Sequence, residues 1–282
     1  MPPVVDLGRS SGAREVADSL RNSGFAVITN HPIPLPGFRE LFDAWGSFFR
    51  SSRKTDYPAD ASSQAGYFSP EQAETAIGSP DRDLKEYFQY WPDTALPPET
   101  RKLTIRIFDQ MFSLAGDILS SLERQTSASL WQRLPTPLGH CLSRSDTMLR
   151  ILRYPPLRGD EPRNAIRASA HEDINFITLL PAASEAGLEI RPRGQDWQPV
   201  EAPEGAIIIN IGDMLQELTD GVLPSTTHRV VNPRPGTAHR ARLTAPLFCH
   251  PEPDLVLSDR YTAGEYLTER LNEINPEALR PR

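Results

Sequence analysis

The sequence predicts a mainly β protein with added α-helices, whose core is a double-stranded β-helix, or jelly roll. Three observations lead to this fold class. Short β-prone runs separated by turn residues fill the chain after residue 146. Most helical periodicity lies before that point, and it includes a long amphipathic pattern over residues 98–124. The 28 prolines in 282 residues favour many loops between short elements.

The N-terminal part is predicted to alternate short strands with amphipathic helices. Apolar spacing predicts a strand at residues 4–7 and a helix at 12–23. Gly24 would stop this helix, and an apolar run predicts a buried strand at 25–29. A second amphipathic helix is expected at residues 36–51.

The middle part is predicted to be a loop followed by one long helix. Residues 54–82 are rich in proline, serine, aspartate and glycine, which favours a loop, and residues 83–91 form a short aromatic-rich segment. The helical pattern within residues 98–124 has one apolar face, formed by Leu103, Ile107, Met111, Leu114, Ile118 and Leu122. These elements predict an N-terminal helical layer and a long supporting helix.

The last part is predicted to supply the eight strands of the jelly roll. They are expected at residues 147–154, 166–171, 175–181, 187–191, 197–200, 206–211, 226–231 and 241–249. The chain would then be one compact unit of residues 1–282. Its parts would be a mostly helical region at 1–146, the jelly roll at 147–250 and a C-terminal extension at 251–282.

Composition excludes several classes of partner. The net charge is −7 with acidic and basic residues intermixed, which argues against nucleic-acid binding. No apolar run reaches the roughly 18 residues that span a bilayer, and no signal peptide is evident, so we expect no membrane partner. Cys141 and Cys249 are too few for a disulfide framework, which favours a reducing, cytoplasmic setting. The sequence does not predict an oligomeric state.

A metal site is predicted from the spacing of three residues. His171 and Asp173 are two apart in a predicted strand and therefore share a face, whereas Glu172 points away. His228, in another β-prone run, is the candidate third ligand. Two imidazoles and one carboxylate on one face of an octahedron suit an iron(II) oxygenase, because three positions stay open for a chelating co-substrate and dioxygen.

This metal assignment has alternatives. The His-x-Asp pair alone is a weak signal, and it gains weight from the distal histidine and the β-rich context. Zinc is chemically compatible with these ligands, but the HExxH helix of zinc proteases is absent. The four other histidines are not accompanied by a comparable set of motifs and are expected to be structural or exposed, namely His31, His140, His239 and His250.

An anion site is predicted from a second pair of residues. Arg242 and Thr244 are also two apart on a predicted strand, so their side chains share a face. A guanidinium facing the barrel interior needs an anionic partner, and a dicarboxylate that chelates the metal at one end would supply it. Tyr154 is a candidate third donor to that distal carboxylate. The alternative is a surface arginine paired with a protein acid.

The motifs together resemble a known family over nearly the whole chain. The opening segments, the Asp-Leu-Lys-Glu-Tyr-Phe run and five later motifs occur in the family's order, at residues 4–7, 24–31, 83–88, 153–156, 171–173, 210–213, 228–230 and 242–244. This set resembles the isopenicillin N synthase-like branch of the iron(II)/2-oxoglutarate-dependent oxygenases. Threonine stands at 244 where the family has serine.

The resemblance implies a function and roles for the candidate residues. It implies iron(II), 2-oxoglutarate and dioxygen as cofactor and co-substrates, with oxidation of a C–H bond in a small-molecule metabolite and release of succinate and carbon dioxide. Hydroxylation is expected, and desaturation or cyclisation are variants of it. The implied iron ligands are His171, Asp173 and His228, and the implied site for the 5-carboxylate of 2-oxoglutarate comprises Arg242, Thr244 and Tyr154.

Two departures keep alternatives open. Plant members often have asparagine where this chain has Leu152, and residues 177–180 are closer to isopenicillin N synthase itself. That enzyme uses no 2-oxoglutarate, so the first alternative is an iron(II) oxidase of that type. The second is a non-catalytic jelly-roll binding protein, against which the intact triad argues.

Other residues are assigned from motif and composition. Residues 210–213 are expected to form a strand end, a glycine turn and an aspartate cap on a helix through Leu218. Five aromatic residues are candidates for lining the pocket mouth, with ordinary core packing as the alternative: Tyr67, Phe88, Tyr90, Phe176 and Phe248.

Overall fold

The N-terminal elements form where the sequence predicts them. The computed structural model describes residues 1–60, 62–72, 82–162 and 164–274. The elements are β1 (Val4–Asp6), α1 (Gly12–Ser23), β2 (Phe25–Thr29) and α2 (Leu35–Arg50). Gly24 ends α1 with a φ of 69°, and a Cβ there would lie 2.3 Å from the carbonyl oxygen of Pro224. Only glycine fits this turn without strain.

The region predicted as a loop contains more structure than expected. It holds β3 (Gly66–Phe68), which pairs with β4 (Glu86–Tyr90), and the two short 3-10 helices η1 (Ser52–Asp56) and η2 (Pro70–Gln72). Residues 61 and 73–81 of that region lie outside the described residues. The long helix α3 (Pro98–Arg124) matches the predicted span, and η3 (Ala128–Trp131) and η4 (Leu138–His140) follow it.

The remaining strands lie close to their predicted positions. They are β5 (Met148–Tyr154), β6 (Ala168–His171), β7 (Ile177–Pro181), β8 (Leu188–Ile190), β9 (Gln198–Pro199), β10 (Ile207–Ile211), β11 (His228–Val230), β12 (Arg242–Thr244) and β13 (Leu247–Cys249). The predicted strand at 241–249 is two strands, because Pro246 has no N–H to continue the ladder. The helical elements between and after them are α4 (Asp213–Leu218), η5 (Pro235–Thr237) and α5 (Ala263–Ile274).

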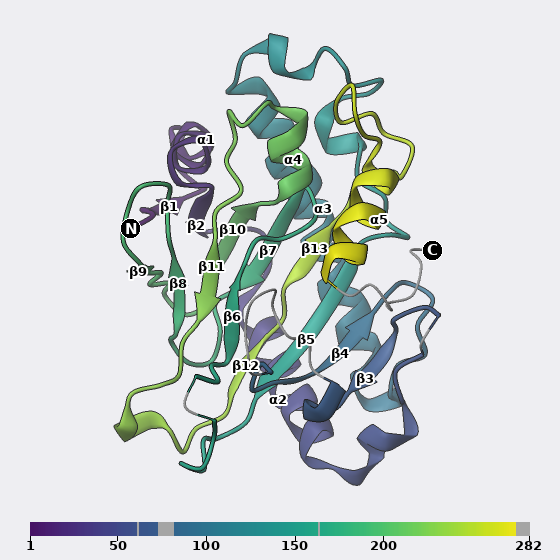
Figure 1. Ribbon diagram of the computed structural model, residues 1–282. Helices are drawn as coiled ribbons and strands as arrows, with labels where there is room; N and C mark the ends of the chain where they lie inside the picture. The colour runs from purple at the N-terminus through teal and green to yellow at the C-terminus, as the bar shows by residue number, and fades with distance from the viewer. Residues whose placement is uncertain (61, 73–81, 163, 275–282) are drawn as a thin grey trace.

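Two facing sheets form the jelly roll (Figure 1). Within the described ranges, the larger sheet has the order β1-β2-β10-β7-β13-β5-β4-β3, with β12 also paired to β5. The smaller sheet has the order β6-β11-β8-β9. The predicted fold class, a mainly β jelly roll with a helical layer, is confirmed by this arrangement.

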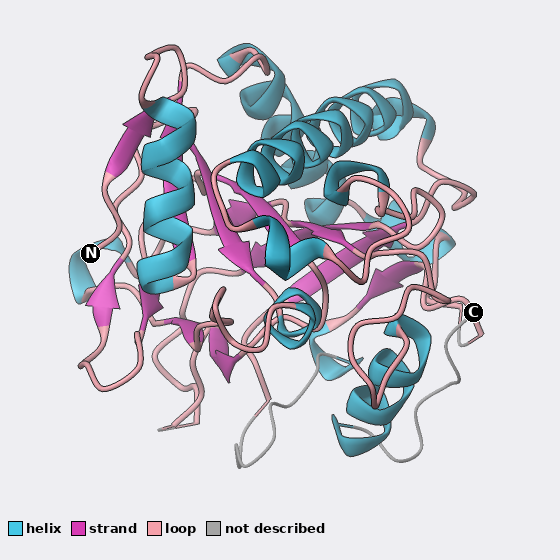
Figure 2. Ribbon diagram, turned by 90° about the horizontal axis from the view of Figure 1, so that it is seen from above, coloured by secondary structure: helices cyan, strands magenta, loops and turns pink. Residues whose placement is uncertain are grey.

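The strands of the larger sheet present alternate residues to two different layers. Odd-numbered residues of β7, β10 and β13 pack with the helices in the main core, as Ile209 and Leu247 do. Even-numbered residues face the interior between the sheets, as Ile208 does. The long helix α3 lies on one side of the strands and α5 on the other (Figure 2). None of the helices in the described ranges is long and apolar enough to cross a membrane.

Candidate active site

The three predicted metal ligands meet at one end of the smaller sheet. His171 ends β6 and His228 begins β11, and the two residues are directly paired across these antiparallel strands. Asp173 follows two residues after β6. Its Oδ1 lies 3.7 Å from Nε2 of each histidine, and the ligand atoms of all three residues lie within 4.8 Å of one another. This spacing fits a single metal ion.

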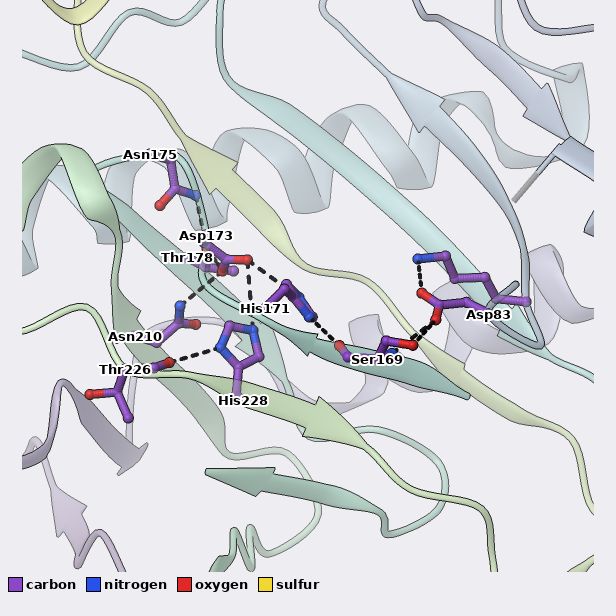
Figure 3. Close-up of polar contacts among 10 residues, drawn as sticks. Asp83, Ser169, His171, Asp173, Asn175, Thr178, Asn210, Thr226 and His228 are labelled. Atoms are coloured by element: carbon purple, nitrogen blue, oxygen red, sulfur yellow. Dashed lines mark hydrogen bonds and ion pairs between the residues drawn. The ribbon is translucent and has the colours of Figure 1, made fainter. Parts of the chain in front are cut away.

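Hydrogen bonds behind the triad orient its ligand atoms (Figure 3). Nδ1 of His171 lies 2.7 Å from the Ser169 carbonyl oxygen, and Nδ1 of His228 lies 3.1 Å from that of Thr226. When each Nδ1–H donates to its carbonyl, each Nε2 keeps its lone pair for a metal.

The carboxylate of Asp173 is held in the same way. Its Oδ2 accepts hydrogen bonds from Thr178 Oγ1 at 2.6 Å and from Asn210 Nδ2 at 2.9 Å. These two bonds occupy one oxygen of the carboxylate. The other oxygen, Oδ1, is the one that faces both imidazoles.

The electrostatics of the triad favour metal binding. Burial alone would raise the pKa of Asp173, but the adjacent imidazoles and the two hydrogen bonds outweigh it, so the pKa lies below its usual range. Although 41% of the His171 side chain is exposed, desolvation and the neighbouring His228 imidazole lower its pKa to about 4. At pH 7, Asp173 is therefore ionised and His171 neutral, as metal ligation requires.

Of two acidic residues near the triad, Glu172 lies as predicted and Asp213 does not. Glu172 points away from the site as predicted, and its Oε1 accepts a hydrogen bond from Thr227 Oγ1 at 2.7 Å. The predicted aspartate cap on α4 is wrong, because the N-cap residue is Gly212 and Asp213 is the first helical residue. A Cβ at position 212 would lie 2.3 Å from the backbone carbonyl oxygen of Asn175, so glycine is needed there.

The predicted anion-binding residues lie together on β12 and β5. Arg242 is paired with Tyr154 across these strands, and its guanidinium carbon lies 5.1 Å from the centre of the tyrosine ring. Arg242 is 2% exposed, and its Nε donates to the Glu185 carbonyl oxygen at 2.9 Å. Among the described residues, Arg242 Nη1 and Thr244 Oγ1 have no hydrogen-bond partner. A buried cation beside an unused hydroxyl fits an anionic ligand.

One cavity of about 70 Å³ joins the two groups of residues. The triad, Arg242, Thr244 and Tyr154 all line it. The other lining residues are Phe25, Lys85, Arg150, Leu152, Ala168, Thr178, Leu180, Leu188, Asn210, Val230, Pro246 and Phe248. A ligand in this cavity can touch the metal position and the guanidinium together.

Only one of the five predicted pocket aromatics, Phe248, lines this cavity. The others belong to the main core, so their predicted pocket position is wrong. Phe88 and Tyr90 share the helix-facing side of β4, where they pack on Trp45 and Phe108. Their neighbour Tyr87 faces the interior instead.

Tyr67 and Phe176 are also core residues. The hydroxyl of Tyr67 donates to Glu86 Oε2 at 2.6 Å, and Phe176 is completely buried. Four polar residues that line the cavity were not predicted as site residues, namely Lys85, Arg150, Thr178 and Asn210. The period-two pattern of β5 could have found Arg150, because it shares a face with Tyr154.

Comparison with known proteins decides the family. A model of the 2OG-Fe(II) oxygenase superfamily matches residues 145–251, and one of the N-terminal region of a non-haem dioxygenase in morphine synthesis matches residues 2–107. A proline hydroxylase of Petromyces alliaceus is 32% identical over 243 residues, which cover 78% of this chain and 74% of the relative. The chain belongs to the 2OG-Fe(II) oxygenase superfamily.

Solved structures agree with this assignment. A Shewanella oneidensis protein assigned as an oxygenase is 38% identical, with a TM-score of 0.87 over 96% of this chain and 98% of that one. A full-length Neurospora crassa protein in complex with alpha-KG has the same fold, with a TM-score of 0.79 at 21% identity over 96% of each chain. This oxygenase is thus an iron(II)- and 2-oxoglutarate-dependent enzyme, as predicted, and the predicted branch is consistent with the N-terminal match.

Proposed function

We propose that this oxygenase oxidises a C–H bond of a small molecule with iron(II) held by His171, Asp173 and His228. The observation that carries the proposal is the single cavity that joins these side chains to a buried guanidinium. Three protein ligands leave an octahedral ion three positions for other ligands. When bound, the iron supplies the oxidising chemistry, and 2-oxoglutarate leaves as succinate and carbon dioxide.

The co-substrate would be placed by the opposite end of the cavity. Arg242 offers a charge-assisted fork and Thr244 a hydroxyl to the distal carboxylate, and Tyr154 lies against the guanidinium. The apolar wall, which includes Leu152 and Leu188, would exclude water from the carbon chain between the two carboxylates.

The alternative without 2-oxoglutarate is disfavoured by the same residues. An oxidase of the isopenicillin N synthase type would have to fill the site at Arg242 with part of its own substrate. The superfamily match and the buried guanidinium favour a dedicated co-substrate. The non-catalytic alternative does not explain why two hydrogen bonds fix the orientation of the Asp173 carboxylate.

The primary substrate would lie along the interior face that β13 and its C-terminal end present. Phe248 lines the cavity that contains the triad, and His250, two residues further along the chain, lines a second cavity of about 120 Å³. The second cavity also borders α5. Because side chains two apart on an extended chain share a face, these two residues offer a common floor along which a small molecule could reach the iron.

A cytoplasmic location is proposed from the cysteines. Cys141 and Cys249 are both free and buried in the structure. Burial raises the pKa of both thiols, which keeps them in the less reactive protonated form. A protein with two unpaired thiols fits a reducing compartment.

The proposal is tested by co-substrate titration. Anaerobic protein with iron(II) and 2-oxoglutarate should develop a weak visible charge-transfer absorption, and turnover should release succinate. Arg242→Met should weaken 2-oxoglutarate binding by about 2–5 kcal/mol, because a desolvated charge pair is lost. Thr244→Val should cost about 1 kcal/mol, as for a neutral donor.

Arg39→Met is the matched control, because Arg39 lies in an exposed ion pair with Glu204. It should bind 2-oxoglutarate like the wild type. Substrate turnover without 2-oxoglutarate and without succinate would overturn the proposal in favour of the oxidase.

A further inference from the structure

A second buried arginine lies near the proposed co-substrate site. Arg167 directly precedes β6 and is 1% exposed. Its Nη2 donates to the Arg240 carbonyl oxygen at 3.0 Å. Within the described part of the chain, its Nε and Nη1 have no hydrogen-bond partner.

Arg167 and Arg242 share one aromatic neighbour. The guanidinium carbon of Arg167 lies 5.9 Å from the centre of the Tyr154 ring, and that of Arg242 lies 5.1 Å from it. Desolvation, followed by the charge of Arg242, lowers the pKa of Arg167, and Tyr154 and Glu185 offset only part of this effect. Among the described residues, neither guanidinium forms an ion pair within 4.0 Å, and the acid that acts on Arg167, Glu185, is paired with Arg240 at 3.4 Å.

Two buried cations that form no ion pair of their own are costly unless an anion compensates them. Leaving buried charges unpaired is strongly destabilising, whereas apolar residues of similar volume are often neutral or stabilising in such places. A neutral donor would be enough for the one hydrogen bond that Arg167 makes to the Arg240 carbonyl oxygen. A purely structural role therefore does not account for the charge of Arg167.

We propose that Arg167 is a specificity-determining and positioning residue that makes the cavity select a dianionic co-substrate. This inference rests on the proposed placement of the distal carboxylate at Arg242. Arg167 is not among the residues that line the cavity, so it would act through Tyr154 and through its charge, without touching the co-substrate. It would raise the local positive potential at the end of the cavity that receives the second carboxylate.

The test compares two 2-oxo acids that differ at the distal end. 2-Oxoglutarate carries a second carboxylate, and pyruvate ends in a methyl group. Both would be titrated into the anaerobic iron(II) protein, with dissociation constants taken from calorimetry. Arg167→Met should weaken 2-oxoglutarate binding by about tenfold, the effect of a buried charge acting over several ångströms at an effective dielectric of about 20. Pyruvate binding should stay within about twofold of the wild type.

Two control variants separate charge from packing. Arg167→Lys keeps the positive charge and should lose less 2-oxoglutarate affinity than Arg167→Met. Arg39→Met removes an arginine of an exposed ion pair with Glu204, and it should bind both acids like the wild type.

The outcomes distinguish this inference from the proposed function. Equal weakening of both acids in Arg167→Met, or unchanged 2-oxoglutarate binding, would overturn the role of Arg167. If Arg242→Met also binds 2-oxoglutarate like the wild type, the proposed placement of the carboxylate itself is wrong. A loss of 2-oxoglutarate affinity alone in both variants supports both proposals.

Discussion

Replacing Thr178 by valine should weaken iron binding, although Thr178 is not a metal ligand. Its hydroxyl donates to Asp173 Oδ2 at 2.6 Å and accepts from Asn175 Nδ2 at 2.9 Å. Valine has nearly the same shape and replaces only the hydroxyl, with a methyl group. Asp173 then keeps the single bond from Asn210 and can rotate its Oδ1 away from the imidazoles.

The magnitude follows from the lost bond. A hydrogen bond to a charged group contributes about 1.5–3 kcal/mol. This range corresponds to roughly a tenfold to hundredfold weaker iron(II) affinity. The Asn175 amide would also lose a buried acceptor, which should lower the free energy of unfolding by about 1–3 kcal/mol.

The assay is anaerobic competition for iron(II) against a chelator, combined with urea unfolding of the metal-free protein. Thr178→Ser is the matched control, because it restores the hydroxyl, and it should recover most of the iron affinity. Iron affinity in Thr178→Val equal to that of the wild type would refute the argument that this bond aims Oδ1 at the metal.

Three further predictions concern the triad, the aromatic residues and the metal. Asp173→Gly should lose iron and hydroxylation even with excess iron and chloride, because the carboxylate is the only anionic protein ligand; full iron content with undiminished product would exclude Asp173 as a ligand. Phe88→Ala should cost about 3–5 kcal/mol of folding stability with little change in the substrate KM, whereas Phe248→Ala should raise that KM. Steady-state kinetics and urea unfolding check both variants. A raised KM in Phe88→Ala without loss of stability would place Phe88 in the pocket. Removing iron with a chelator should lower Tm reversibly, because the ion binds the folded state, and scanning calorimetry with and without added iron(II) measures this; an unchanged Tm would contradict it.

Local pattern and spacing in the sequence predict which site residues share a strand face. The two-residue spacing of His171 and Asp173, and of Arg242 and Thr244, is enough to place each pair on one face. The sequence names His228 as a candidate third ligand from its β-prone run, and the family resemblance supports it. The strand pairing that brings His228 to His171 is a long-range contact that spacing alone does not predict.

The wrong predictions concern positions where the register of a strand decides which face a side chain lies on. Phe88 is a pocket candidate only by its aromatic character, but β4 turns its even-numbered aromatic residues toward the helices. A shift of one residue exchanges the faces of a strand, so residue type alone could not choose between Tyr87 and Phe88. The hydrogen bonds of the buried residues Asn210 and Arg167 are made to partners distant in the sequence, so no local pattern predicts them.

The alternation along β5 separates two kinds of evolutionary change. Leu149 and Ile151 belong to the core shared with the helices, whereas Arg150, Leu152 and Tyr154 line the cavity. Substitutions at the first set alter folding stability, and substitutions at the second alter what the cavity accepts. A library that varies Arg150 of β5 and Phe248 of β13, and keeps Leu152 and Tyr154 for the co-substrate, would therefore sample new substrates while leaving the helix-packed core intact.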